Sequence, residues 1–135
     1  MTKKFKKIGE SENTEYFVHS DNILIVSPVQ GYKDNAKAAN INMDFQLDFA
    51  NKLERKCGLV VILNNLLSQD ADARKIYSDR TDPDLFFGIA LVVNNPLSRA
   101  IASFFVGLSK PKIPLTIVNS VESGIVVLET ANKEK

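Results

Sequence analysis

The chain has 135 residues, 44% of them hydrophobic and 24% charged, which suits one globular domain with a core and excludes a disordered or fibrous chain. A formal net charge of +1 gives no overall preference for nucleic acid or an anionic membrane. Cys57 is the single cysteine, so no intrachain disulfide can form and a reducing compartment is favoured. Because no apolar segment follows the N-terminal lysines, and no apolar run reaches the ~18 residues of a spanning helix, we expect a cytoplasmic protein without integral membrane association.

The first elements are a tail and two strands. Polar, aperiodic sequence at residues 1–13 predicts a flexible N-terminal tail. The segments E-Y-F-V-H-S (15–20) and I-L-I-V-S-P (23–28) then predict two strands around a tight turn at Asp21 and Asn22.

A long helix follows. Residues 33–57 contain no Pro or Gly, and their apolar residues recur at helical spacing up to a stop at Gly58. The main stripe is Ala36, Ala39, Met43, Leu47, Ala50, Leu53 and Cys57. Ile41, Phe45 and Phe49 fall roughly opposite that stripe and would be a large apolar patch for a monomer. Either a loop or the N-terminal tail covers them, or they form a homodimer contact or a partner-docking groove.

Two buried strands flank a short helix. The runs at residues 59–65 and 87–95 are continuously apolar, which is typical of strands covered on both faces in a parallel sheet. Between them, residues 70–78 predict a short helix that begins near Ser68 or Gln69.

The last part of the chain continues the alternation of strands and helices. Asn95 and Pro96 form a capping side chain followed by proline at the first helical position, and the helix ends near Gly107. Residues 113–119 predict a strand. In residues 121–131, a capping residue at Ser120 favours helix, whereas Gly124 and the β-branched residues after it oppose helix; the preceding alternation favours helix.

The predicted order is therefore β-β-α-β-α-β-α-β-α. This order defines the fold class as α/β, one domain over residues 14–131 with a mostly parallel sheet flanked by helices. Residues 132–135 are expected to form a C-terminal tail.

The helix after Pro96 has few polar residues on any side. Its apolar face is Leu97, Ala100, Ile101, Phe104, Phe105 and Leu108. Its other positions are small or weakly polar, and Arg99 is its only charge, which indicates burial on more than one side. Together with the long helix, this predicts a candidate interaction surface of Ile41, Phe45, Phe49, Arg99 and Val106.

The sequence offers few groups for catalysis. The single histidine, His19, cannot form a triad with its neighbours, and one His and one Cys cannot make a zinc site. Acids between residues 70 and 84 match no metal-binding motif, and no Gly-rich phosphate loop is present. We therefore predict no catalytic residue, no metal and no cofactor.

One polar feature remains. Asn64, Asn65, Asn94 and Asn95 each follow a buried strand, at the edge where open α/β sheets bind ligands. Asparagine also caps free backbone groups, so these residues are either turn and cap residues or a polar ligand site.

The segment L-V-V-N-N-P-L-S-R-A-I-A-S-F-F-V-G-L-S-K-P-K-I-P-L-T-I-V, together with the predicted order of elements, resembles the STAS group of anti-sigma-factor-antagonist-like domains. The nearer resemblance is to an uncharacterised bacterial branch described as STAS-like or lipid-transfer-like. The resemblance implies a STAS-like (SpoIIAA-like) fold. Regulatory members of the group carry a phosphorylated serine at the start of the helix after the third strand. Here the matching turn is Asp70, Ala71 and Asp72, a degenerate phosphoacceptor turn without a hydroxyl.

These observations favour a non-enzymatic STAS-like domain that acts through contact with a protein partner or with itself as a homodimer. The alternative is a small carrier or sensor that binds an apolar ligand or lipid. No nucleic acid partner is expected.

Overall fold

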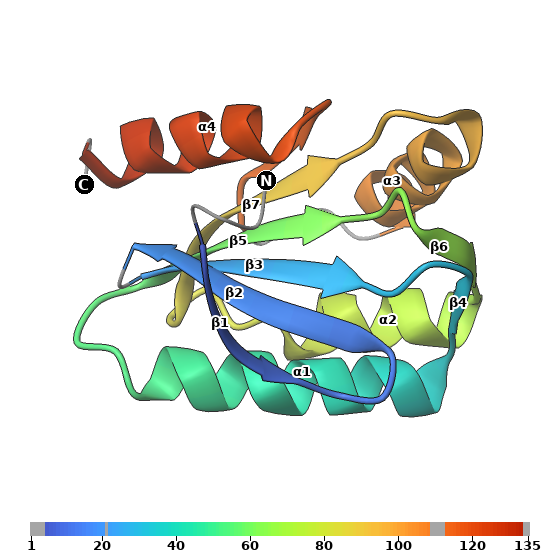
Figure 1. The fold of residues 1–135 in the computed structure, drawn as a ribbon, viewed down its shortest axis with the longest axis horizontal. Helices are drawn as coiled ribbons and strands as arrows, with labels where there is room; N and C mark the ends of the chain where they lie inside the picture. The colour runs from blue at the N-terminus through green and yellow to red at the C-terminus, as the bar shows by residue number, and fades with distance from the viewer. Residues whose placement is uncertain (1–4, 21, 109–112, 134–135) are drawn as a thin grey trace.

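The computed structural model describes residues 5–20, 22–108 and 113–133, with the backbone alone for residues 104–108 and 133 (Figure 1). Over these residues the chain forms eight strands and four helices. Their order is β1 (Lys6–Glu10), β2 (Thr14–Ser20), β3 (Ile23–Pro28), β4 (Tyr32–Asp34), α1 (Ala36–Asn51), β5 (Cys57–Ile62), β6 (Leu66–Gln69), α2 (Ala71–Arg80), β7 (Phe86–Val92), α3 (Pro96–Leu108), β8 (Leu115–Val118) and α4 (Val121–Lys133).

The described strands form a six-stranded sheet in the order β1-β2-β3-β5-β7-β8 and a separate ribbon of β4 and β6. The pairs β1–β2 and β2–β3 are antiparallel, whereas β3–β5, β5–β7 and β7–β8 are parallel. The expectation of a mostly parallel sheet is therefore wrong. The sheet is mixed, because the first three strands form a meander before the helical crossovers begin.

Most expected elements are confirmed, including the two helix starts that depend on capping. Asn95 Oδ1 accepts a hydrogen bond from the Ser98 backbone N–H at 2.8 Å at the start of α3. Ser120 Oγ accepts one from the Ser123 N–H at 3.1 Å at the start of α4, so the ambiguous last segment is a helix. Of the predicted turn between β2 and β3, Asp21 lies outside the described residues.

Three expectations need correction. Part of the expected tail is strand β1, which pairs with β2. The long helix ends at Asn51, because Cys57 pairs with Phe86 and Gly58 with Gly88 in the parallel sheet. The short strands β4 and β6 were not expected; β6 includes Ser68 and Gln69, and Asp70 directly after them caps α2.

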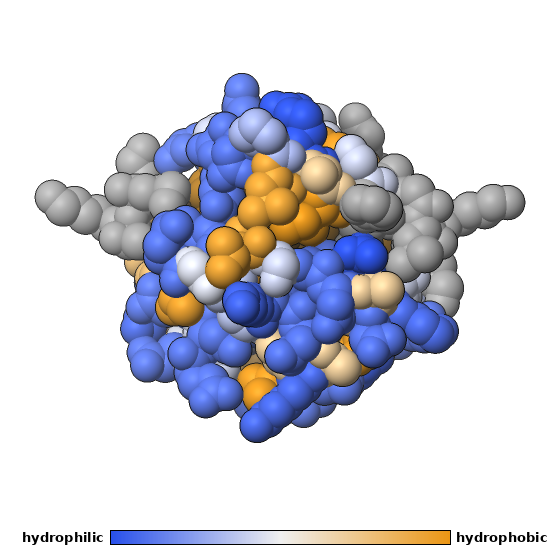
Figure 2. Space-filling view, turned by 90° about the vertical axis from the view of Figure 1, so that its right-hand side faces the viewer, coloured by the Kyte–Doolittle hydropathy of each residue, from blue (hydrophilic) through white to orange (hydrophobic). Residues whose placement is uncertain are grey.

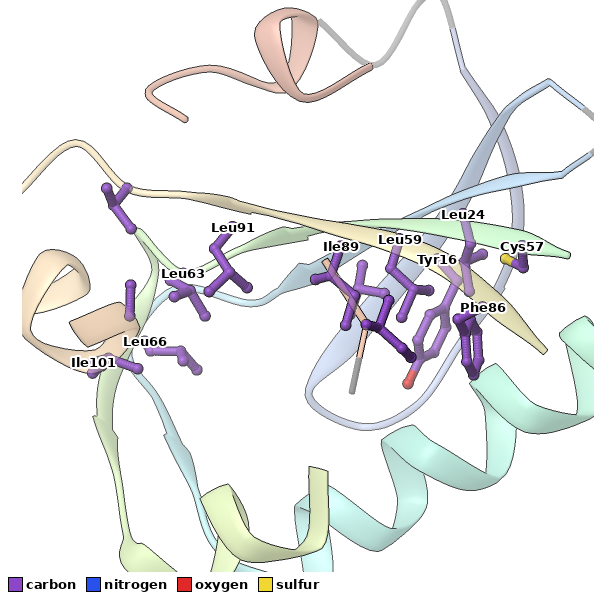
Figure 3. Packing of buried hydrophobic residues seen from close by; sticks show 14 of the residues in the cluster. Tyr16, Leu24, Cys57, Leu59, Leu63, Leu66, Phe86, Ile89, Leu91 and Ile101 are labelled. Atoms are coloured by element: carbon purple, nitrogen blue, oxygen red, sulfur yellow. The ribbon is translucent and has the colours of Figure 1, made fainter. Parts of the chain in front are cut away.

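Helices cover both faces of the sheet, with α4 on one side and α1 and α2 on the other (Figure 1). Alternate residues of each central strand face opposite layers, as in Leu59 and Val60 of β5. The layer under α1 includes Tyr16, Leu24, Leu59, Phe86, Ile89 and Leu91 (Figure 3). The layer under α4 includes Ile25, Val60, Phe87, Ile125 and Leu128.

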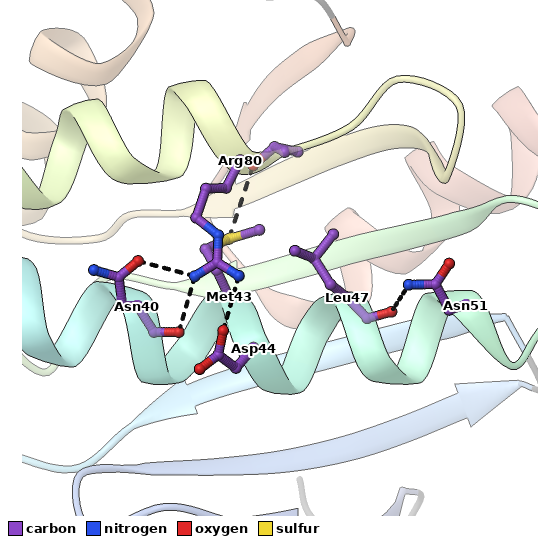
Figure 4. Close-up of polar contacts among 7 residues, drawn as sticks. Asn40, Met43, Asp44, Leu47, Asn51 and Arg80 are labelled. Carbon is purple, nitrogen blue, oxygen red and sulfur yellow. Dashed lines mark hydrogen bonds and ion pairs between the residues drawn. The ribbon is translucent and has the colours of Figure 1, made fainter.

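Arg80 joins α2 to α1 (Figure 4), and Thr81 adds a contact with Met43. The Arg80 guanidinium donates to Asn40 Oδ1 at 2.9 Å and pairs with Asp44 at 2.8 Å. Thr81 Oγ1 lies 3.9 Å from the sulfur of Met43, which is fully buried. Since Asp44 is largely exposed, the ion pair contributes no more than about 1 kcal/mol, and burial of Met43 anchors the contact more strongly.

The packing of α4 predicts a difference between two of its residues. Leu128→Ala removes a side chain that is 2% exposed and should lower the free energy of unfolding by about 2–5 kcal/mol. Val126→Ala changes a side chain that is 61% exposed and should alter it by less than about 0.5 kcal/mol. Urea unfolding of both variants measures this, and equal effects would contradict the assignment of the inner face of α4.

Candidate functional site

A buried polar cluster lies between α1, α2 and the sheet. We call it the Asp34 cluster, and its members are Tyr16, Tyr32, Asp34, Asn42, Gln69 and Tyr77. They come from β2, β4, α1, β6 and α2, so the cluster connects five elements from separate parts of the sequence: β2, the adjacent pair β4 and α1, and the adjacent pair β6 and α2.

The hydrogen bonds of the cluster converge on the Asp34 carboxylate. Tyr77 Oη donates to Asp34 Oδ1 at 3.0 Å, and Tyr32 Oη donates to the same oxygen at 3.2 Å. Gln69 Nε2 donates to Asp34 Oδ2 at 2.9 Å. The chain of bonds continues outward, because Asn42 Nδ2 donates to Tyr77 Oη at 3.1 Å and Tyr16 Oη donates to Asn42 Oδ1.

Burial dominates the electrostatics of this cluster. Asp34 is 4% exposed, and burial raises the pKa of its carboxyl above the usual value, opposed by the hydrogen bonds from Gln69, Tyr77 and Tyr32. Burial also raises the pKa of Tyr16 to about 12 and raises the pKa of Tyr77. The tyrosine hydroxyls therefore stay protonated at neutral pH and serve as donors.

The local sequence explains why Asp34 points inward. Gly31 has a φ of +78°, a conformation that favours glycine, and it turns the chain from β3 into β4. In β4, Tyr32 and Asp34 are buried and Lys33 between them is exposed. Asp34 is the register partner of Gln69 in β6, which brings the amide to the carboxylate.

A cavity of about 50 Å³ lies beside the cluster. Its walls are mostly apolar, and Figure 3 shows Leu59, Ile89 and Leu91 projecting from the sheet toward α1 and α2. The polar side chains on its lining are Tyr32, Asp34, Asn42, Gln46, Gln69, Tyr77 and Thr81. An apolar pocket with a few convergent polar groups is the usual form of a small-molecule site.

The four asparagines lie near one another at the carboxyl edge of the parallel strands. Asn64 Oδ1 accepts from the Asn94 backbone N–H at 2.8 Å, and Asn95 Nδ2 donates to the Asn64 carbonyl at 3.2 Å. Asn65 Nδ2 donates to the Pro28 carbonyl at 3.1 Å. These bonds satisfy backbone groups where strands end, which is the capping role.

The candidate interaction surface on α1 is partly covered by the same chain. The Phe45 ring stacks on Tyr16 with a centroid distance of 3.8 Å and an interplanar angle of 8°. A Cβ at Gly9 of β1 would lie 2.7 Å from Phe45 Cε2, so backbone and ring are in close contact. Ile41 and Phe49 are half-buried.

The rest of this predicted surface lies on α3. Arg99 is exposed near the start of the helix. The side chain of Val106 lies outside the described residues.

The degenerate phosphoacceptor turn is at the start of α2. Asp70 is the N-cap, and its carboxylate accepts from the Ala73 N–H at 2.8 Å. Ala71 and Asp72 are exposed in the first turn.

Residues suited to catalysis lie apart. Within residues 5–20, 22–108 and 113–133, no three His, Cys, Asp or Glu residues are grouped so that they could hold a metal. His19 Nε2 lies 3.5 Å from Glu129 Oε2 at the surface. Cys57 is fully buried, and burial raises its pKa to about 12.

The Asp34 cluster was not predicted from the sequence. The available signal was Y-K-D after Gly31, a period-2 pattern in which the polar Asp34 takes an inward position. A strand of three residues is too short for this alternation to identify it from the sequence.

Together, the fold and cluster define a single-domain mixed α/β protein with helices on both faces of its sheet. None of the helices described is long and apolar enough to cross a membrane. The chain belongs to the family described as "Domain of unknown function (DUF7793)", whose model matches residues 16–132. Its structure is similar to that of apo-SiaC from Pseudomonas aeruginosa, with a TM-score of 0.50 and 14% identity, over 84% of this chain and 97% of that chain. At this identity the likeness shows the fold alone. A comparison with curated proteins found no match.

Burial of Asp34 predicts a pH dependence of stability. Because the folded pKa is raised above 3.8, the contribution of Asp34 to stability is largest below that pH and is lost as pH rises through the folded value. Asp34→Asn replaces the carboxyl with a group that does not titrate, so this fall in stability with rising pH disappears. The Gln69 amide can rotate to accept a hydrogen bond from the new Nδ2. The variant should therefore gain stability relative to wild type as pH rises toward neutrality, measured by urea unfolding between about pH 4 and pH 8. Exposed Asp72→Asn is the control, and a relative loss of stability with rising pH in Asp34→Asn would refute the assignment.

Burial of Cys57 predicts an unreactive thiol. With a pKa of about 12, roughly one thiol in 10⁵ is ionised at pH 7, and the sulfur is inaccessible as well. Ellman's reagent should leave the folded protein unmodified over hours and react at once in urea. Fast labelling of the native chain would show that this region opens readily.

Proposed function

We propose that this protein is a non-enzymatic STAS-like domain that acts as a regulatory component by binding another protein in the cytoplasm. The sequence resemblance to the STAS group supports this reading. The shared fold with SiaC is compatible with it.

The observation that carries the proposal is apolar surface at the carboxyl edge of the parallel strands. Val29 follows β3, Leu67 lies in β6 and Leu97 lies in the first turn of α3; their exposed fractions are 40%, 53% and 44%. We call these three residues the edge patch. Figure 2 faces this side and shows a band of hydrophobic surface with hydrophilic surface above and below it. Apolar surface with a polar rim is typical of protein-binding sites.

The edge patch is preferred to the α1 face predicted from sequence. Phe45 is already stacked on Tyr16 and approached by Gly9, so little of its ring is left for a partner. Arg99 in the first turns of α3 is exposed, and it lines a surface hollow with Ile117 and Ser123.

The turn at Asp70–Asp72 bears on regulation. It has no hydroxyl, so we propose that partner binding is not switched by phosphate at this turn. Asp72 supplies a constant negative charge there, smaller than that of a phosphate and with fewer acceptors.

A second candidate function is sensing of a small ligand, and the cavity beside Asp34 favours it. At about 50 Å³ the cavity is well below the ~150 Å³ that holds benzene in an engineered protein. It is therefore far too small for a lipid chain in this conformation.

Site-specific photocross-linking tests the protein-binding proposal. A benzophenone amino acid at position 67 or 97, in the cells that make the protein, should give one adduct of defined mass, and mass spectrometry would identify a different protein or a second copy. Position 126 on α4 is the matched control, because Val126 is apolar and 61% exposed but lies away from the edge patch. Equal adducts at position 126, or none at 67 and 97, would refute the proposal.

A further inference from the structure

We infer that the cavity beside Asp34 binds a short alkylammonium ion, a molecule with one protonated amine and an apolar tail of a few carbon atoms. This inference specifies the ligand of the second candidate function and does not depend on the edge patch.

Two buried amides on the cavity lining have unused hydrogen-bonding groups. Gln46 is 4% exposed, and its side chain makes no hydrogen bond within the described part of the chain. Gln69 uses its Nε2 on Asp34, while its Oε1 is buried without a partner among the described residues. A buried polar atom left unsatisfied costs about 1–3 kcal/mol, so Gln69 Oε1 favours a polar group in the cavity.

The negative Asp34 carboxylate indicates that the polar group of the ligand carries a positive charge. Its three hydrogen-bond donors are two phenols and one amide, all neutral. Among the ion pairs of the described residues, none includes Asp34. A buried charge is stabilised by pairing with a charge of opposite sign, and hydrogen bonds between charged partners are stronger than neutral ones.

A primary ammonium group suits this set of acceptors. It has three N–H donors and no acceptor. Asp34, Gln46 and Gln69 line the cavity, and their side chains carry carboxylate or carbonyl oxygens that can accept these N–H groups. An alcohol would satisfy an amide but leave the charge unpaired, and a carboxylate would be repelled by Asp34.

The volume and the apolar walls of the cavity limit the length and the chemistry of the ligand's tail. Its volume of about 50 Å³ exceeds the ~10–15 Å³ that one water needs and is too small for an aromatic ring. Leu59, Ile89 and Leu91 supply apolar contacts. A tail of two to four carbons, roughly, follows from these limits.

An NMR titration of the full chain tests the inference. The probes are n-propylammonium chloride, propan-1-ol and sodium propionate at matched ionic strength. The ammonium should produce saturable shifts of the Gln46 and Gln69 side-chain NH₂ signals, with a Kd no tighter than roughly 40 µM for about four heavy atoms. The alcohol and the carboxylate should bind at least about tenfold more weakly.

Two variants test the contributions of the Asp34 charge and of the Gln46 amide to binding. Asp34→Asn should weaken propylammonium binding at least about tenfold, because it removes the charge and because the Gln69 oxygen then turns toward the new Nδ2. Gln46→Leu should also weaken it. Gln30→Leu is the matched control at an exposed glutamine and should leave the Kd unchanged.

Several outcomes would overturn the inference. These are equal responses to the three probes, shifts confined to exposed amides, no saturable shift, or unchanged affinity in Asp34→Asn. Saturable binding of propan-1-ol without the ammonium would overturn the ammonium assignment and leave the ligand-sensing function standing. Failure of all three probes would remove the ligand function, and neither result affects the cross-linking test.

Discussion

A carboxylate taken out of water needs other groups to replace its hydration, and this requirement organises one half of the molecule around Asp34. Its hydrogen-bond donors come from β4, β6 and α2, and a second shell of bonds reaches α1 and β2. A two-stranded ribbon such as β4–β6 is marginally stable alone. Here it is held because Asp34 and Gln69 bond to each other and to residues of α2. The same arrangement makes the adjoining cavity polar at the cluster and apolar along the sheet.

The carboxyl edge of the parallel strands gathers the features that suit recognition. Strands β3, β5 and β7 end there, and the chain between them is fixed by Asn64, Asn65 and Asn95, which bond to backbone groups across neighbouring connections. These hydrogen bonds restrain the connections near Val29, Leu67 and Leu97, which are exposed to solvent. A rigid apolar surface loses little conformational entropy on binding, which favours association. The cavity beside Asp34 and the edge patch share β6, where Leu66 is buried and lines the cavity and Leu67 is exposed.

Sequence patterns predicted those elements whose signal is local. The continuous apolar runs of β5 and β7, and the caps at Asn95 and Ser120, depend on nearby residues alone. The predicted end of the long helix was wrong. Leu53 and Cys57 continue the helical spacing of apolar residues, but Cys57 pairs with Phe86 across the sheet and therefore lies in strand β5. Strand β1 was missed because K-K-I-G-E is an edge strand with mostly exposed residues. Asp34 could not be identified, because its burial depends on Gln69 and Tyr77, which lie far along the chain.

The contact between Gly9 and Phe45 ties the two positions together over evolutionary time. The ring occupies the space where any side chain at position 9 would begin, so a larger residue there requires a smaller one at position 45. Loss of the ring would in turn leave Tyr16 without its stacking partner at the end of the buried hydrogen-bond chain. Drift at the two sites should therefore be correlated among family members, linking the outermost strand of the sheet to the polar centre of the fold.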